Sequence, residues 1–156
     1  MTKEKKRSER LNSVGKIASD KEQKALSSLV ELKKALQQAE AKLKTLRQYH
    51  FQYSNSVAKP SNALLSAGLL VEHHRFLVNL EKSITTQEQQ IMALKQKVEE
   101  AQAVYTQRKV ERRAVEKAQE RLLVKAEAKM RRDEQKMQDE LSQKSTNQSL
   151  FRKLLS

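Results

Sequence analysis

The sequence is poor in the residues from which a wide globular core is built. Among its 156 residues there is no Trp and no Cys, aromatic residues make up 4%, and there are only two Gly and one Pro. The apolar side chains can therefore fill a narrow seam between helices but not a broad core. The absence of cysteine excludes disulfides and thiolate metal sites, and it fits a cytosolic protein.

Long hydrophobic runs are also missing. A helix needs about 18 to 20 mostly apolar residues to cross a bilayer, and no window of this sequence approaches that composition. The first ten residues are basic, but the apolar segment that a signal peptide requires does not follow them. We therefore expect neither a signal peptide nor a membrane-spanning helix.

Acidic residues are too few to balance the basic ones. The 32 Lys and Arg against 19 Asp and Glu give a net charge of +13. Such an excess favours an acidic partner, which can be a nucleic acid, an anionic membrane surface or an acidic protein face. Charge alone does not choose among these three.

Lys, Arg, Glu, Gln, Ala and Leu dominate, and all of them favour helices. Apolar or small residues recur at steps of three and four in two stretches, as in coiled coils. The first stretch is Leu29, Leu32, Leu36, Ala39, Leu43 and Leu46. The second is Leu70, His73, Leu77, Leu80, Ile84, Gln87, Ile91, Leu94, Val98, Ala101 and Tyr105. Because the only proline lies between them, the pattern predicts an all-α fold, a long antiparallel two-helix coiled coil or helical hairpin.

Leu11 and Val14 lie in or beside the seam when its spacing is extended backwards, so the first helix could begin early, with Gly15 as a weak point. The capping-box spacing of Ser19 and Glu22 predicts a firmer start near residue 19. Pro60 then ends it near residue 57, and the second helix is expected to reach about Gln143. The predicted parts are a basic, flexible N-terminal arm (1–15), the antiparallel coiled coil (16–143) with its turn at 57–68, and a polar C-terminal tail (144–156).

The predicted second helix is longer than the first. If Tyr53 faces Leu70 or His73, paired residues have numbers that sum to roughly 125, so residues beyond about Lys125 have no partner in this chain. An apolar stripe nevertheless continues there, and it is suited to another protein. Its members are Val115, Ala118, Leu122, Ala126, Met130, Met137 and Leu141.

A basic ridge is the strongest charge feature. It consists of cations at a spacing of four residues: Lys109, Arg113, Lys117, Arg121, Lys125 and Lys129. Ten Lys or Arg and four Glu between residues 107 and 132 give a net charge of +6. Five successive like-charge pairs cost an isolated helix about 1 to 2.5 kcal/mol. Either an acidic partner offsets that cost, or the ridge is a solvated face of a basic coiled coil.

Aromatic residues gather near the predicted turn, at Tyr49, Phe51, Tyr53 and Phe76. Only Tyr53 occupies the seam, whereas Tyr49 and Phe76 lie one position before it, on the flank. Large rings on the flank of two helices stay partly exposed, and exposed apolar patches commonly mark protein contacts. The alternative is that these rings only seal the end of the hairpin.

The sequence contains no constellation typical of catalysis. It has no Gly-rich phosphate loop and no cysteine nucleophile, and two helices form no deep pocket. His50, His73 and His74 fall short of the four ligands that a structural zinc site needs. We expect no enzyme activity, no metal and no cofactor.

Three blocks of the sequence resemble the FliJ family of flagellar type III export proteins. They are QQAEAKLKTLRQYHFQY at Gln37 to Tyr53, RFLVNLEKSI at Arg75 to Ile84, and RRDEQKMQDEL at Arg131 to Leu141. The resemblance extends from about Ala25 to Gln143, and the blocks keep their order and spacing.

The resemblance implies an antiparallel coiled coil similar to the central stalk of rotary ATPases. The free helix ends, near Leu11 to Leu29 and Val104 to Met137, would enter the hexameric export ATPase, whose lining would accommodate the ridge from Lys109 to Lys129. The membrane protein of the export gate would contact the surface Leu46, Tyr49, Tyr53, Phe76 and Leu80. Export chaperones are a further implied partner. The implied location is the cytoplasmic face of the inner membrane at the flagellar base, through protein partners.

Three alternatives remain at this point. The related stalk protein of injectisomes would share the architecture. A basic coiled coil could bind nucleic acid through phosphates, but no aromatic residue is interleaved with the ridge, so nucleic acid is not the expected partner. The third alternative is a structural homodimer that pairs the stripe from Val115 to Leu141.

Overall fold

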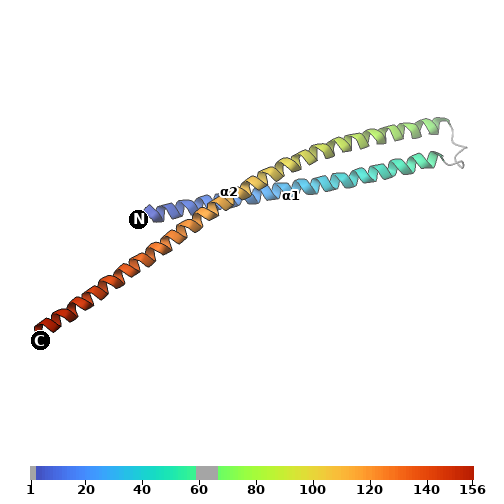
Figure 1. Cartoon of the computed structure of the whole chain (residues 1–156). Coiled ribbons are helices and arrows are strands. Elements are labelled where there is room, and N and C mark those ends of the chain that lie inside the picture. The colour runs from blue at the N-terminus through green and yellow to red at the C-terminus, as the bar shows by residue number, and fades with distance from the viewer. Residues whose placement is uncertain (1–2, 59–66) are drawn as a thin grey trace. The chain divides into compact units, whose positions relative to one another are not determined.

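The computed structural model describes residues 3–58 and 67–156, which form two long α-helices, α1 (Lys3–Ala58) and α2 (Ala67–Leu155) (Figure 1). The two helices pack against each other, which confirms the predicted all-α helical hairpin. Pro60 and the middle of the predicted turn lie outside the described residues. No helix in the described ranges is long and apolar enough to cross a membrane.

Both helices are longer than the sequence predicted. Helix α1 begins at Lys3, so the expected start at Ser19 is wrong, and neither Ser19 nor Gly15 interrupts it. The flanking Lys, Glu and Arg residues are good helix formers, which is why a capping motif inside such a run is not sufficient to start a helix.

Helix α2 continues to Leu155, so the expected end near Gln143 is also wrong. The hydroxyls that made this segment look like a polar tether fold back on their own helix. Thr146 Oγ1 donates to the Ser142 carbonyl at 2.8 Å, and Ser149 Oγ donates to the Thr146 carbonyl at 3.1 Å. Arg152 and Lys153 in the last turn suit the negative end of the helix dipole.

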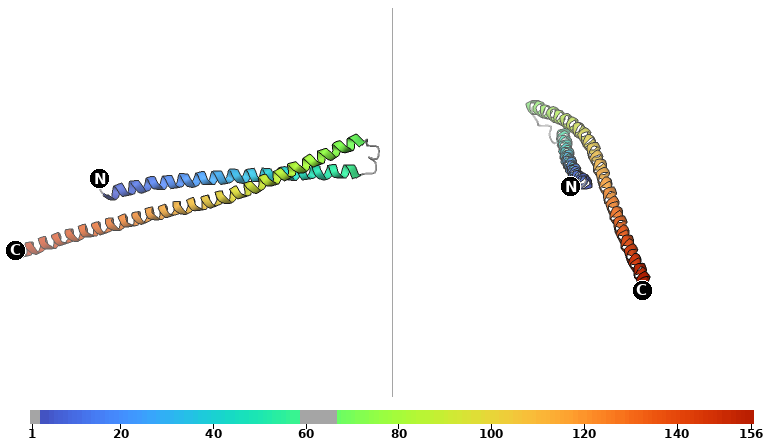
Figure 2. Two further views of the ribbon diagram at one scale, coloured as in Figure 1. Left: turned by 90° about the horizontal axis from the view of Figure 1, so that it is seen from above. Right: turned by 90° about the vertical axis from the view of Figure 1, so that its left-hand side faces the viewer.

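The chain divides into two compact units, which are described separately. The inner unit is Lys21–Lys109, and the terminal unit combines Met1–Asp20 with Val110–Ser156. Each unit contains part of both helices, running in opposite directions (Figures 1 and 2).

The inner unit holds all the buried residues among those described. Leu29, Ile91, Gln87 and Leu80 are 3%, 6%, 5% and 8% exposed. The other predicted seam residues of this unit are half-buried, which confirms the seam. Leu70 and Tyr53 are the exceptions at 46% and 43% exposed, because they lie in the first turn of α2 and near the end of α1.

Polar contacts fix how the helices of the inner unit are aligned. The side chain of Gln87 donates from Nε2 to the Ala39 carbonyl at 3.0 Å, so the buried amide has a partner on the opposite helix. The rings of Tyr53 and His73 stack with centroids 5.4 Å apart, which confirms the predicted pairing of these residues. A buried polar group with a single suitable partner favours one alignment over shifted ones.

The terminal unit packs less tightly. None of its described residues is as buried as those of the inner core; Leu11, Gly15, Val115 and Leu122 are only half-buried. A Cβ at Gly15 would lie 2.6 Å from Gln119 Nε2, so glycine permits the close approach of this amide. Gln119 Nε2 in turn donates to the Leu11 carbonyl at 3.3 Å.

The early start of α1 changes which part of α2 is covered. Lys129 Nζ lies 3.5 Å from Glu4 Oε1, so the expected lack of partners beyond Lys125 is wrong for this residue. From Met130 to the end of the chain every residue is exposed, and Met130, Met137 and Leu141 are 62–66% exposed. The apolar stripe is therefore uncovered only in its second half.

Candidate protein-binding surfaces

The inner unit presents an aromatic surface where α1 ends and α2 begins. Tyr49, Tyr53 and Phe76 are 52%, 43% and 44% exposed. The rings of Tyr53 and Phe76 are 4.5 Å apart between centroids and inclined by 37°. Tyr49 lies one helical turn before Tyr53 and therefore on the same side of α1. Much of the apolar area of these rings therefore remains accessible to solvent.

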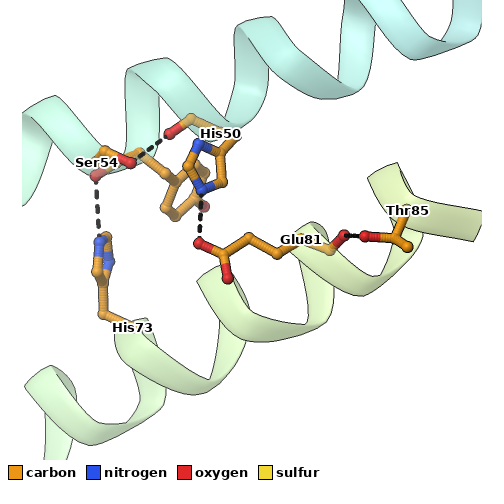
Figure 3. A network of polar contacts seen from close by, with 6 residues as sticks. His50, Ser54, His73, Glu81 and Thr85 are labelled. Atoms are coloured by element: carbon orange, nitrogen blue, oxygen red, sulfur yellow. Dashed lines mark hydrogen bonds and ion pairs between the residues drawn. The ribbon is translucent and has the colours of Figure 1, made fainter. Parts of the chain in front are cut away.

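Cross-helix polar contacts hold the aromatic surface in place. His50 Nε2 lies 3.0 Å from Glu81 Oε1, and His73 Nε2 lies 3.2 Å from the Tyr53 carbonyl oxygen. Figure 3 shows that His50 of α1 points toward α2 and that His73 of α2 points toward α1. Ser54 Oγ donates to the His50 carbonyl at 2.8 Å. Sequence reasoning placed His73 in the seam opposite Tyr53 but did not predict the contact between His50 and Glu81.

The five residues predicted to contact the export gate differ in their exposure to solvent. Leu80 is only 8% exposed and belongs to the seam, and Leu46 is half-buried. Phe51 is 66% exposed but lines a different hollow, together with Leu43 and Arg47.

The described residues contain no group of three or more His, Cys, Asp or Glu side chains placed to hold a metal ion. His74 is exposed on α2, whereas His50 and His73 take part in the contacts of the aromatic surface. The two histidines of the aromatic surface therefore have partners on the opposite helix.

The basic ridge lies along α2. Lys109 is half-buried at the end of the inner unit, and the remaining five members are exposed in the terminal unit: Arg113, Lys117, Arg121, Lys125 and Lys129. Glu116 accepts a hydrogen bond from Arg112 at 2.9 Å, so this glutamate compensates a cation beside the ridge. The exposed part of the ridge places five cations at a spacing of four residues along α2.

A groove in the terminal unit was not predicted. It has a volume of about 500 Å³ and lies between the first turns of α1 and the segment of α2 around Leu122. Leu11 continues the heptad spacing upstream of Gly15 and so indicated that α1 could begin early. The groove itself was missed because it depends on how the side chains of two helices pack, which spacing along one helix does not show.

The fold defines an all-α helical hairpin with an exposed aromatic surface and an exposed basic ridge. Residues 7–150 match the family described as Flagellar FliJ protein. The Flagellar FliJ protein of Escherichia coli (strain K12) is 30% identical over 129 residues, which cover 83% of this chain and 88% of that protein. No solved structure matches the chain at a significant level. The chain belongs to the FliJ family, which confirms the resemblance seen in its sequence and favours the flagellar system over the injectisome.

Proposed function

We propose that this chain is a non-enzymatic, stalk-like component of the flagellar type III protein export apparatus. In this role it binds the hexameric export ATPase, promotes its assembly and activity, and contacts the export gate and export chaperones. Its place is the cytoplasmic face of the inner membrane at the flagellar base, where protein partners hold it. Membership of the FliJ family is the observation that carries this proposal.

The basic ridge is the proposed contact with the ATPase. Its exposed cations lie in the terminal unit, and their charge suits an acidic lining of the ATPase ring. The direct test measures ATP hydrolysis by the cognate export ATPase with and without the chain, together with the mass of the complex. We expect stimulation with one chain per hexamer. If the chain neither binds the ATPase nor stimulates it, the proposal is refuted.

Charge reversal locates that contact. We expect Arg113→Glu combined with Lys117→Glu to reduce the stimulation about tenfold or more, because charged contacts at an interface contribute strongly to association. Lys95→Glu combined with Lys97→Glu is a matched control, since both lysines are exposed on α2 in the inner unit. Equal losses in the two double variants would show that net charge, and not the ridge, determines binding.

The aromatic surface is the proposed contact with the export gate. Exposed Tyr and Phe side chains commonly contribute the largest part of interface energies. We expect Tyr49→Ala combined with Phe76→Ala to weaken binding to the cytoplasmic part of the gate protein about tenfold or more. Phe51→Ala is the control, because this ring is exposed but lines another hollow. Loss of helicity by circular dichroism, with loss of both activities, would contradict separate roles for the two surfaces.

A further inference from the structure

The groove of the terminal unit has an apolar floor. It is lined by Leu11 from α1 and by Leu122, Leu123 and Ala126 from α2, within a volume of about 500 Å³. Leu123 is 63% exposed, so its side chain forms an open apolar wall. Ala126 continues the seam after Leu122, but its methyl group is too short to fill the space, and it remains exposed. The helices therefore leave apolar surface uncovered here.

The edge of this groove is mostly basic. Arg7, Lys125 and Lys129 line it together with a single acid, Glu4. The Lys129 ammonium lies 3.5 Å from Glu4 Oε1, and the two side chains are 61% and 73% exposed. The groove thus already accepts one carboxylate at its edge, through a long and exposed ion pair. Such pairs are weak, so a carboxylate from a partner can replace Glu4.

We propose that the groove binds an acidic amphipathic helix of a partner protein, which lies against α1 and α2 as a third helix. The apolar face of that helix would cover Leu122 and Leu123, and its carboxylates would meet Arg7, Lys125 and Lys129. The exposed Met130, Met137 and Leu141 continue the apolar surface along α2. From Leu122 to Leu141 this surface spans about 29 Å, which is enough for a helix of about 20 residues.

The charges of the chain favour such a partner over a second copy of the chain. Residues 107 to 132 carry ten cations and four glutamates, so the same segment of a second copy would bring a further net charge of +6 to the groove. Like charges that face each other across an interface cost several kcal/mol. An acidic helix removes this repulsion and buries the leucines as well.

The probe is a fluorescein-labelled synthetic peptide of about 20 residues, with Leu at the helical positions i, i+3, i+4 and i+7 and mostly Glu elsewhere. Its control is a scrambled peptide of the same composition. Fluorescence anisotropy with the full chain should show saturable binding that is about tenfold or more tighter for the amphipathic peptide. Equal affinity for the scrambled peptide would overturn the proposal, because it would show attraction by charge alone.

Two pairs of variants locate the binding site. Leu123→Gln should weaken peptide binding about fivefold or more. Met92→Gln is the matched control and should leave binding unchanged, because Met92 is also exposed, at 72%, but lies in the inner unit. Glu4→Gln should strengthen peptide binding about twofold or more relative to Glu9→Gln, because it removes the carboxylate that competes for Lys129. Glu9→Gln changes the net charge equally, but Glu9 lies outside the groove.

Equal effects within either pair would refute the groove as the site. A doubled mass in sedimentation, with no binding of the peptide, would show instead that a second copy covers this surface. Lys125 and Lys129 also belong to the basic ridge, so this inference rests in part on the cations proposed to contact the ATPase. Because the titration contains no export ATPase, peptide binding can fail while stimulation of the ATPase is observed, and the reverse.

Discussion

Replacing Gly15 by alanine tests how α1 and α2 meet in the terminal unit. Gly15 lies inside α1, where alanine is favoured over glycine by about 0.8 to 1 kcal/mol. Its new Cβ, however, would lie 2.6 Å from Gln119 Nε2, closer than non-bonded atoms approach each other. Because the obstacle is the end of a flexible side chain, the Gln119 amide would move and the backbone would stay in place.

That movement costs the hydrogen bonds of Gln119. Its Nε2 donates to the Leu11 carbonyl at 3.3 Å and lies 3.5 Å from Asn12 Oδ1. A typical hydrogen bond contributes about 0.5 to 1.5 kcal/mol, and these long, partly exposed ones belong at the lower end. We therefore expect Gly15→Ala to change the free energy of unfolding by less than about 0.5 kcal/mol.

The same substitution in a Gln119→Ala background meets no amide. Gly15→Ala should then stabilise the terminal unit by about 0.8 to 1 kcal/mol, so the double-mutant cycle should give a coupling of about 0.5 to 1 kcal/mol. Urea unfolding followed by circular dichroism and native-state hydrogen exchange of residues 3–20 would measure it. Equal effects of Gly15→Ala in both backgrounds would refute the contact between these two residues.

Three further predictions concern the distribution of stability. Leu29→Ala should lower the free energy of unfolding by about 2 to 4 kcal/mol in urea titrations, because Leu29 is 3% exposed; a loss below about 1 kcal/mol would contradict its place in the core. Arg47→Ala should lower the free energy of unfolding by less than about 1 kcal/mol, because the 2.7 Å ion pair of Arg47 with Glu88 is exposed. The same loss of stability at low and at high salt would exclude that ion pair as the cause. Hydrogen exchange should be faster for the amides of residues 3–20 than for those around Leu29, and the reverse order would contradict the looser packing of the terminal unit.

The seam of the inner unit could be predicted because a heptad pattern depends only on the spacing along one helix. Leu29, Leu80 and Ile91 are buried as the spacing indicates. The same reasoning failed for Leu70, since spacing does not tell how far the partner helix covers a first turn. It also failed for the start of α1, where a common capping pattern at Ser19 occurs within a run of good helix formers.

The candidate surfaces could be predicted only in part. Tyr49 and Phe76 stood out because large rings on the flank of a seam stay accessible, and the structure leaves both exposed. Tyr53, which was placed in the seam, is exposed as well. The contact between His50 and Glu81 depends on which residues face each other across the two helices. The groove depends in addition on the gap beside Ala126, which follows from the size of side chains on both helices. Neither is a property of one stretch of sequence.

The contact between Leu11 and Gln119 joins residues 108 positions apart in the chain. Translation proceeds at about 5 to 20 residues per second, so the first turns of α1 wait roughly 5 to 20 s before their partner is synthesised. During that time Leu11 has no α2 to pack against, whereas Tyr53 and His73 are separated by only 20 positions. The helices are thus expected to pair first in the inner unit, and the first turns of α1 are expected to find their native contacts later.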